Sequence, residues 1–232
     1  MSRQGNISKK KVDGKVAKQI PEAVIYRLPL YLRVLILLQQ GNIDFVNSQG
    51  LGAHLQLTSA QIRKDLSYFG RFGKQGRGYN VGRLLGELRH ILGLDLNWQV
   101  AMVGTGRLGR AIMDYKGFIP EAFNIAAAFD KAPGQIGKKV SGVVIKDISE
   151  LKTIVLEQNI DIAIVAVPPA EAQGVIDELA ASGIKAILNY APVAAQVPLG
   201  VRLQGIDPVL ALQSMTFRLS RNQVSKKLKG TL

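Results

Sequence analysis

A glycine-rich loop between an apolar strand and a helix constrains the fold of this chain more than any other feature. The loop reads Gly104-Thr105-Gly106-Arg107-Leu108-Gly109. Four apolar residues, 100–103, precede it, and helical spacing follows over residues 107–115. In this pattern the first glycine permits a tight turn, the second lets the backbone approach a pyrophosphate, and the third lets the helix pack on the strand. The loop therefore predicts a dinucleotide-binding unit, in which a pyrophosphate lies at the helix N-terminus.

The segments that follow alternate between strand and helix patterns. Apolar runs predict strands at residues 125–129, 160–167, 184–188 and 201–206. Helical spacing predicts helices at residues 148–158 and 169–182. This alternation is typical of an α/β fold with a doubly wound parallel sheet of the Rossmann type.

Asp130 is the acidic residue expected at the end of the second strand, 26 positions after Gly104. Its carboxylate can accept hydrogen bonds from both hydroxyls of an adenosine ribose and would repel a 2′-phosphate. The sequence therefore favours NAD(H) over NADP(H) as the cofactor, although Lys131 softens that preference. Arg107 can add a charge contact to the pyrophosphate.

The side chains behind the loop favour sensing over catalysis. A dehydrogenase usually has a general acid or base near the nicotinamide. The chain has no cysteine, and its two histidines, His54 and His90, both precede the loop. Lysine, aspartate or tyrosine could serve instead, with Tyr115 as one candidate. We therefore expect a cofactor-binding protein that is not an enzyme, with no metal site.

A second signature precedes the loop. Helical spacing predicts a first helix that begins with Pro21 at its first position and that Gly41-Asn42 ends. It also predicts a short second helix that Ser48 caps and that runs to Leu55. Gly50 and Gly52 are expected to weaken the second helix by roughly 1 kcal/mol each. A turn at Gln56-Leu57 leads to a third helix, capped by Thr58 or Ser59, that ends near Phe69.

The third helix has the side chains of a DNA-reading helix. Ile62, Leu66 and Phe69 are expected to point inward, and the exposed side carries Gln61, Arg63, Lys64 and Ser67. Asp65 is unusual in such a helix and is expected to orient a neighbouring arginine. The glycine-rich segment 72–79 predicts a hairpin or wing whose Lys74, Arg77 and Tyr79 contact DNA. Residues 81–92 return to helical spacing.

The charge is concentrated at the two ends of the chain. The net charge is +13. Residues 1–99 contain 15 Lys and Arg against 6 Asp and Glu, residues 100–213 contain 10 against 11, and residues 214–232 contain 5 against 0. A basic head on a neutral body indicates a local polyanion site rather than general basicity.

The chain is expected to be cytoplasmic. Residues 1–18 are polar and have no apolar core of a secretory signal. The longest apolar window, 24–38, contains Arg27, Pro29 and Arg33 and is too short for a bilayer. The absence of cysteine excludes disulfides and thiolate zinc sites.

Six segments of the chain together resemble the Rex family of redox-sensing transcriptional repressors. These segments are residues 61–70, 78–79, 88–93, 104–109, 114–118 and 187–193, and the resemblance covers about residues 20–220. It implies a winged-helix domain, a Rossmann domain that binds NADH or NAD+, and a C-terminal helix exchanged between the protomers of a homodimer. It also implies that accumulating NADH lifts repression.

The resemblance also implies roles for single residues. Arg63 and Lys64 are expected to read DNA, and Tyr190 to lie near the nicotinamide at the dimer interface. Arg33, Tyr115 and Asp207 match the family's switch positions. Gly50 and Gly52 depart from the family pattern, and Tyr190 stands where phenylalanine would also be expected.

We therefore expect four parts: a disordered basic arm (1–19), a winged-helix DNA-binding domain (20–95), a Rossmann NAD(H)-binding domain (96–206), and a domain-swapped helix with a basic tail (207–232). Asp207-Pro208 is a good start for that last helix, which is expected to run to about Leu219. The favoured function is an NADH-responsive homodimeric repressor that binds a palindromic DNA operator. Two alternatives stay open: an NAD-dependent oxidoreductase with a regulatory head, and a nucleotide- or CoA-binding module whose head binds protein.

Overall fold

A computed structural model describes residues 20–73 and 76–229 of the chain. The chain divides into two compact units, one ending at Asp95 and the other beginning at Leu96. We call them the head unit and the body unit. The predicted basic arm, Lys74 and the end of the tail lie outside the described residues.

The head unit contains four helices and one short strand pair among its described residues. These elements are α1 (Glu22–Gln40), β1 (Phe45–Val46), α2 (Ser48–Leu55), α3 (Ser59–Ser67), β2 (Tyr79–Asn80) and α4 (Val81–Ile91). β1 and β2 pair antiparallel, with Phe45 opposite Asn80 and Val46 opposite Tyr79. Tyr31, Leu35, Leu51, Ile62 and Leu88 form the centre of a core that all four helices share.

Several details of the head unit differ from the sequence-based expectations. Pro21 is the N-cap of α1 rather than its first residue. Asn47, not Ser48, caps α2, because its side-chain oxygen accepts a hydrogen bond from the Gly50 amide. β2 pairs with β1, which lies before α2, so the wing is not a hairpin confined to residues 72–79.

Packing requires glycine at position 52 of α2 and leaves little room for a side chain at position 50. A Cβ at Gly52 would lie 2.3 Å from the carbonyl oxygen of Leu57, and one at Gly50 would lie 3.0 Å from Val46 Cγ2. The helix-forming tendency lost at these positions is therefore offset by a close approach between α2 and the turn that leads to α3. The expected cost of these glycines to the helical tendency of α2 stays a prediction.

The body unit is built on a seven-stranded sheet in the order β5-β6-β4-β3-β7-β8-β9. The strands are β3 (Trp98–Val103), β4 (Phe123–Asp130), β5 (Lys139–Val140), β6 (Val143–Asp147), β7 (Ile162–Val165), β8 (Ala186–Asn189) and β9 (Arg202–Gly205). All adjacent pairs are parallel except β5 and β6, an antiparallel hairpin that the sequence reasoning missed.

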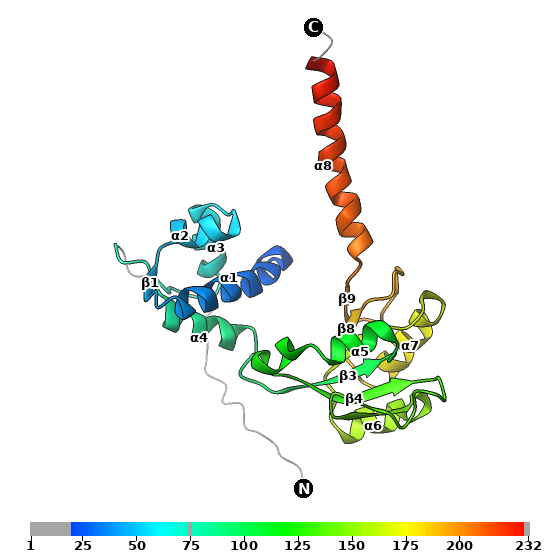
Figure 1. Cartoon of the computed structure of the whole chain (residues 1–232). Coiled ribbons are helices and arrows are strands. Elements are labelled where there is room, and N and C mark those ends of the chain that lie inside the picture. Colours follow the sequence, from blue (N-terminus) through cyan, green and yellow to red (C-terminus); the bar gives the residue numbers. More distant parts are fainter. Residues whose placement is uncertain (1–19, 74–75, 230–232) are drawn as a thin grey trace. The chain divides into compact units, whose positions relative to one another are not determined.

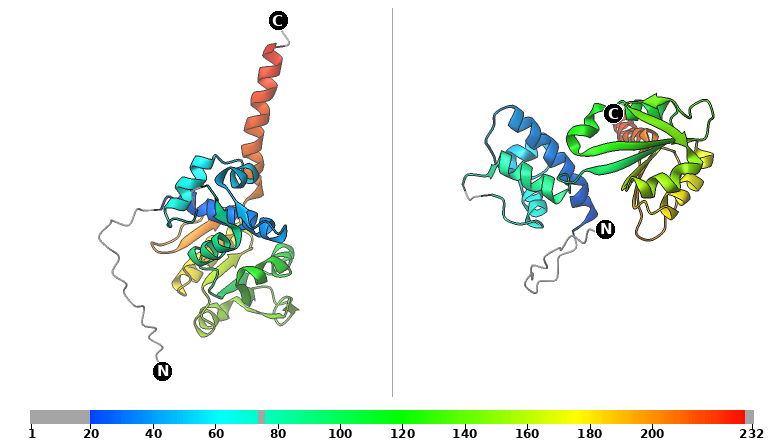
Figure 2. Two further views of the ribbon diagram at one scale, coloured as in Figure 1. Left: turned by 90° about the vertical axis from the view of Figure 1, so that its left-hand side faces the viewer. Right: turned by 90° about the horizontal axis from the view of Figure 1, so that it is seen from below.

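Helices cover both faces of this sheet, as expected for a doubly wound fold (Figures 1 and 2). Successive residues of β3 point to opposite faces: Ala101 and Val103 pack with α6 (Leu151–Glu157) and α7 (Pro169–Ala181). Val100 and Met102 pack with α5 (Arg107–Met113). Two 3-10 helices, η1 (Lys116–Glu121) and η2 (Ile148–Glu150), complete the connections.

The chain continues from β9 into helix α8 (Pro208–Lys229). The Asp207 side chain caps it by accepting a hydrogen bond of 2.8 Å from the Val209 amide, as the sequence predicted. The helix extends ten residues beyond the expected end at Leu219. Its large apolar side chains are mostly exposed: Val209, Leu210, Leu212, Met215, Phe217 and Leu219.

Candidate functional sites

The predicted DNA-reading helix α3 forms with the expected orientation. Thr58 caps it, because its Oγ1 accepts a hydrogen bond of 3.1 Å from the Gln61 amide. Ile62 and Leu66 are buried, whereas Arg63, Lys64 and Ser67 are exposed. The spacing of apolar residues therefore fixed which side of α3 is free to meet a ligand.

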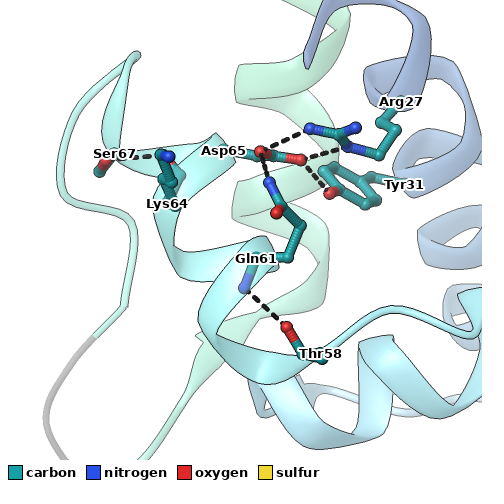
Figure 3. A network of polar contacts seen from close by, with 7 residues as sticks. All are labelled: Arg27, Tyr31, Thr58, Gln61, Lys64, Asp65 and Ser67. Atoms are coloured by element: carbon teal, nitrogen blue, oxygen red, sulfur yellow. Dashed lines mark hydrogen bonds and ion pairs between the residues drawn. The ribbon is translucent and has the colours of Figure 1, made fainter. Parts of the chain in front are cut away.

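Asp65 lies on the buried side of α3 and binds three side chains (Figure 3). The Arg27 guanidinium donates from Nε to Oδ2 at 2.6 Å and from Nη2 to Oδ1 at 2.9 Å. The Tyr31 hydroxyl donates to Oδ2 at 2.5 Å, and Gln61 Nε2 donates to Oδ1 at 2.6 Å. Asp65 therefore orients an arginine as predicted, but that arginine comes from α1 rather than from α3.

The contacts of Asp65 keep the group ionised. Burial would raise the pKa of the Asp65 carboxyl, but the hydrogen bonds from Arg27, Tyr31 and Gln61 outweigh it and hold the pKa below its ordinary value of 3.8. Burial and the Asp65 carboxylate raise the pKa of Tyr31, so its phenol stays protonated and donates. The network is thus a fully partnered buried carboxylate that joins α3 to α1.

A groove of about 690 Å³ runs beside the exposed side of α3. Three arginines line it: Arg63 from α3, and Arg71 and Arg77 from the wing segment. Arg63 Nη1 donates to Ser48 Oγ at 3.1 Å, and the Arg77 guanidinium carbon lies 4.6 Å from the centroid of the Phe45 ring. These contacts hold two cations at the groove wall without neutralising them.

Three side chains that are predicted to contact DNA have partners or packing within the head unit. The side-chain nitrogen Nε2 of Gln61 donates to Asp65, and the Ser67 hydroxyl donates to the Lys64 carbonyl at 2.7 Å. Tyr79 is 8% exposed and belongs to the core, so it is not a surface residue of the wing as predicted. Burial raises the pKa of Tyr79, and the nearby Arg63 charge opposes this. Tyr79 nevertheless forms part of the groove wall.

The glycine loop at the end of β3 has the predicted geometry. Gly104 has a φ of +92°, and a Cβ there would lie 2.5 Å from the Ala166 carbonyl oxygen. A Cβ at Gly109 would lie 1.9 Å from the Gly104 carbonyl oxygen. Gly106 differs, because a Cβ there would meet no described atom within 4 Å. The outer glycines are thus required by the protein's own packing, whereas the middle one leaves open space for a ligand.

Asp130 lies at the end of β4, directly beside this loop. Its Oδ2 accepts hydrogen bonds from Thr105 N at 2.8 Å and Thr105 Oγ1 at 2.7 Å, and its Oδ1 accepts one from Ala132 N at 2.9 Å. Burial would raise the pKa of Asp130, but these bonds outweigh it and lower the pKa. The carboxylate is therefore ionised and oriented. The side chain of Thr105, a residue of the predicted cofactor-binding loop, is buried and binds Asp130.

A cavity of about 510 Å³ adjoins the loop and Asp130. Gly104, Gly106, Asp130 and Lys131 line one side of it, and Glu171 of α7 lines another. The open space at Gly106 and the ionised Asp130 fit the pyrophosphate and ribose of a dinucleotide. Arg107 and Leu108 are exposed and are not among the described lining residues of this cavity.

Sequence reasoning missed Arg110, which secures the loop. Its Nε donates to the Thr105 carbonyl at 3.0 Å, and its Nη2 donates to the Gln135 side chain. Arg110 lies one residue after Gly109, in the helix that follows the loop. This position next to the glycine motif could have indicated that its side chain folds back onto the loop.

The remaining predicted residues lie elsewhere. Tyr115 is 62% exposed, packs edge-on against Phe118 and lines a separate cavity of about 460 Å³. Tyr190 packs on the sheet face that α5 covers. Arg33 is exposed on α1 in the head unit, and Asp207 caps α8 in the body unit. Their roles in cofactor binding and switching stay predictions.

Residues 20–73 and 76–229 show neither a metal site nor a membrane span. This part of the chain holds no cluster of three or more His, Asp or Glu side chains suited to a metal ion. None of its helices combines the length and apolar content that a membrane span needs.

Two family models match the chain. The CoA binding domain matches residues 95–193, and the putative DNA-binding protein N-terminus matches residues 19–67. The first match covers the body unit from β3 through β8 and leaves out β9 and α8, and the second covers the head unit through α3.

Relatives extend the match to most of the chain. A redox-sensing transcriptional repressor Rex from Chloroflexus aggregans is 50% identical over 205 residues, which cover 88% of this chain and 97% of the relative. One from Brevibacillus brevis is 44% identical over 203 residues, covering 88% and 98%. The chain belongs to the Rex family.

Solved Rex-family structures have the same fold. A crystal structure of RSP in complex with beta-NAD+ and operator DNA has a TM-score of 0.85 at 38% identity, covering 91% of this chain and 97% of that one. RSP in complex with beta-NADH has a TM-score of 0.83 at 35% identity, covering 90% and 99%. The Rex relatives are named repressors, so the oxidoreductase alternative is not supported.

Proposed function

We propose that this Rex-family chain represses transcription as a homodimer bound to operator DNA and leaves the operator when NADH binds its body unit. The observation that carries the proposal is the presence of two sites in one chain. One is the arginine-lined groove beside α3, and the other is the cavity beside the glycine loop and Asp130. The Rex relative RSP, captured with both beta-NAD+ and operator DNA, supports the same pairing.

In this proposal α3 supplies the sequence reading and the wing supplies affinity. The exposed Arg63 and Lys64 reach base edges, where arginine and lysine bind guanine O6 and N7. Arg71 and Arg77 also line the groove, outside α3, and contact phosphates. The Asp65 network holds α3 on α1, so the reading side chains start from a fixed helix.

The body unit binds NADH or NAD+ through the glycine loop. The pyrophosphate lies over Gly106, where a Cβ would meet no described atom within 4 Å. Asp130 accepts the hydroxyls of the adenosine ribose, because its carboxylate is ionised and already oriented by Thr105 and Ala132. The bound nucleotide would supply the redox-sensitive nicotinamide. Tyr190 is predicted to lie near that ring.

The exposed apolar side chains of α8 support a homodimer. Six large apolar side chains between Val209 and Leu219 are more than half exposed. Such a surface is unusual for a solvated helix and favours packing against a partner protomer. A two-fold dimer reads a palindromic operator with half-sites a helical turn, or a multiple of it, apart. A repressor of this kind acts in the cytoplasm.

The switch depends on the nicotinamide, where NADH and NAD+ differ. A ligand shifts a two-state dimer only by its differential affinity for the two states. In the proposed mechanism Asp207 pairs with Arg33 in the DNA-binding state and accepts a hydrogen bond from Tyr115 in the NADH-bound state. Asp207 cannot satisfy both partners equally in one geometry.

A gel shift on a palindromic promoter fragment tests the proposal. The expected result is a retarded complex with NAD+ that dissociates as NADH is titrated in. A DNA complex that does not dissociate when the protein is saturated with NADH would contradict the redox response. Saturation is measured separately by NADH fluorescence. Truncation of the chain after Ile206 should give monomeric or insoluble protein, whereas a soluble and stable dimer would contradict the exchange of α8.

A further inference from the structure

A lysine and a glutamate form an ion pair at the cavity that contains Asp130. Lys131 follows Asp130 in the chain, and Glu171 lies in the first turn of α7, 40 positions away. Lys131 Nζ donates to Glu171 Oε1 at 2.7 Å. Both side chains line the cavity, and they are 66% and 32% exposed. The sequence draws attention only to Lys131, because it is the basic residue beside Asp130. The fold brings Glu171 next to it.

The charges around this cavity are unbalanced. Among the described residues that line it, three carry carboxylates (Asp130, Glu171 and Glu178) and one, Lys131, carries an ammonium. NADPH differs from NADH by a 2′-phosphate on the adenosine ribose, which brings about −1.5 to −2 further charges. Lysine binds phosphate as a point charge. A free Lys131 would therefore be the natural partner of that phosphate.

We propose that Glu171 is a specificity-determining residue, which withholds Lys131 from the 2′-phosphate and so excludes NADPH from the cavity. The inference rests on the proposed function, because it takes Asp130 as the residue that binds the adenosine ribose. It also corrects the expectation that Lys131 softens the preference for NADH. In the structure its ammonium is already bound by a carboxylate.

The contribution of Glu171 is separable from that of Asp130. Asp130 repels the phosphate directly and cannot be removed without losing the ribose contact. Glu171 adds a second negative charge and binds the Lys131 ammonium. An exposed ion pair stabilises a fold little. Its loss is therefore expected to change ligand choice far more than folding.

The test is the Glu171→Gln variant of the full chain, titrated with NADH and with NADPH by nicotinamide fluorescence. The substitution keeps the shape and removes the charge. We expect the ratio of the NADPH Kd to the NADH Kd to fall about three- to tenfold, as a charge-assisted contact replaces a repulsion. The melting temperature should stay within a few degrees of wild type. NADPH should also release operator DNA at lower concentrations than it does from wild type.

Glu178→Gln is the matched control. Glu178 lies about two helical turns further along α7 and lines the same cavity. Its substitution by glutamine removes one negative charge from the cavity but leaves the pair between Lys131 and Glu171 in place. We expect a clearly smaller fall in the ratio. In the double variant Glu171→Gln with Lys131→Ala, most of the NADPH gain should disappear.

Three outcomes would overturn the inference. They are an unchanged ratio in Glu171→Gln, an equal fall in Glu178→Gln, and an NADPH gain that survives Lys131→Ala. Each of them leaves NADH binding by wild type intact, so the proposed function would stand. Wild-type protein that binds neither nucleotide would instead contradict the proposed function, and the inference with it.

Discussion

Arg27 and Asp65 form a two-hydrogen-bond ion pair between α1 and α3, with N–O distances of 2.6 Å and 2.9 Å. The carboxylate is fully buried, whereas the guanidinium side chain is 23% exposed. Removing the carboxylate would therefore leave the Tyr31 hydroxyl without its acceptor in the core and a cation only partly solvated.

Asp65→Ala should lower the free energy of unfolding of the head unit by roughly 2–4 kcal/mol, because it breaks a buried pair from one side. Urea unfolding followed by far-UV circular dichroism measures this. Asp95→Asn is the matched control, since Asp95 pairs with His90 at an exposed site and its loss should cost less than about 1 kcal/mol. Equal losses in the two variants would contradict the importance of burial.

The same carboxylate predicts how stability depends on pH. The folded-state pKa of Asp65 is lower than its ordinary value of 3.8. Its contribution is therefore fully present above pH 3.8 and is lost as the pH falls through the lower folded-state pKa. Urea midpoints measured between about pH 5 and pH 2 should fall more steeply for wild type than for Asp65→Asn. Parallel curves would show that Asp65 does not titrate with folding.

Gly106→Ala and Gly109→Ala should separate ligand binding from folding. A Cβ at position 106 meets no described atom within 4 Å, so this variant should fold with a loss below about 1 kcal/mol. It should nevertheless bind NADH at least about tenfold more weakly, because the new methyl group occupies the place of the pyrophosphate. At position 109 the Cβ would lie 1.9 Å from a backbone oxygen, so that variant should lose stability first. Calorimetry and NADH fluorescence on both variants test this, and a Gly106→Ala protein with unchanged NADH affinity would contradict it.

Arg63→Ala should reduce operator affinity by about 1–3 kcal/mol and affinity for random DNA much less, if Arg63 reads a base. Arg77→Ala, which changes a groove residue of the wing segment, should weaken binding to both DNAs about equally, as loss of a phosphate contact does. Fluorescence anisotropy at several salt concentrations measures both. An Arg63→Ala loss that is equal on operator and random DNA would make Arg63 a phosphate contact.

Tyr115→Phe should keep both DNA binding and NADH binding but lose much of the NADH response. The edge-on packing against Phe118 survives the change, so the loss isolates the hydroxyl. A tenfold response needs about 1.4 kcal/mol of coupling, which one charge-assisted hydrogen bond can supply. Asp207→Asn should blunt the response as well, while keeping the cap of α8. A Tyr115→Phe protein released from operator by NADH as readily as wild type would eliminate this mechanism.

The sequence predicted the elements that local signals determine. The Thr58 cap, the inward Ile62 and Leu66, the glycine loop and the Asp207 cap were all found in the structure. Each can be recognised from residues within a few positions of one another. Periodicity and capping chemistry act over that range.

The missed features depend on residues far apart in the chain. Strands β1 and β2 have two residues each and pair across α2 and α3, so neither shows a periodic pattern. Arg27 and Asp65 are 38 positions apart, and Lys131 and Glu171 are 40 apart. The requirement for glycine at position 52 is an exception, because Leu57 lies only five positions further along the chain, but its carbonyl approaches Gly52 only once the turn after α2 has folded. Spacing alone cannot indicate which distant charges or backbone atoms will meet.

The orientation of Asp130 has a consequence for what such a protein can measure. Thr105 and Ala132 hold the carboxylate in place within the protein itself, and the adenosine half of the nucleotide is the same in both oxidation states. Under the proposed function NADH and NAD+ therefore compete for one anchor that favours neither. When their sum exceeds what is needed to fill the site, occupancy by NADH follows the proportion of the two forms, and dilution of the whole pool leaves the response unchanged.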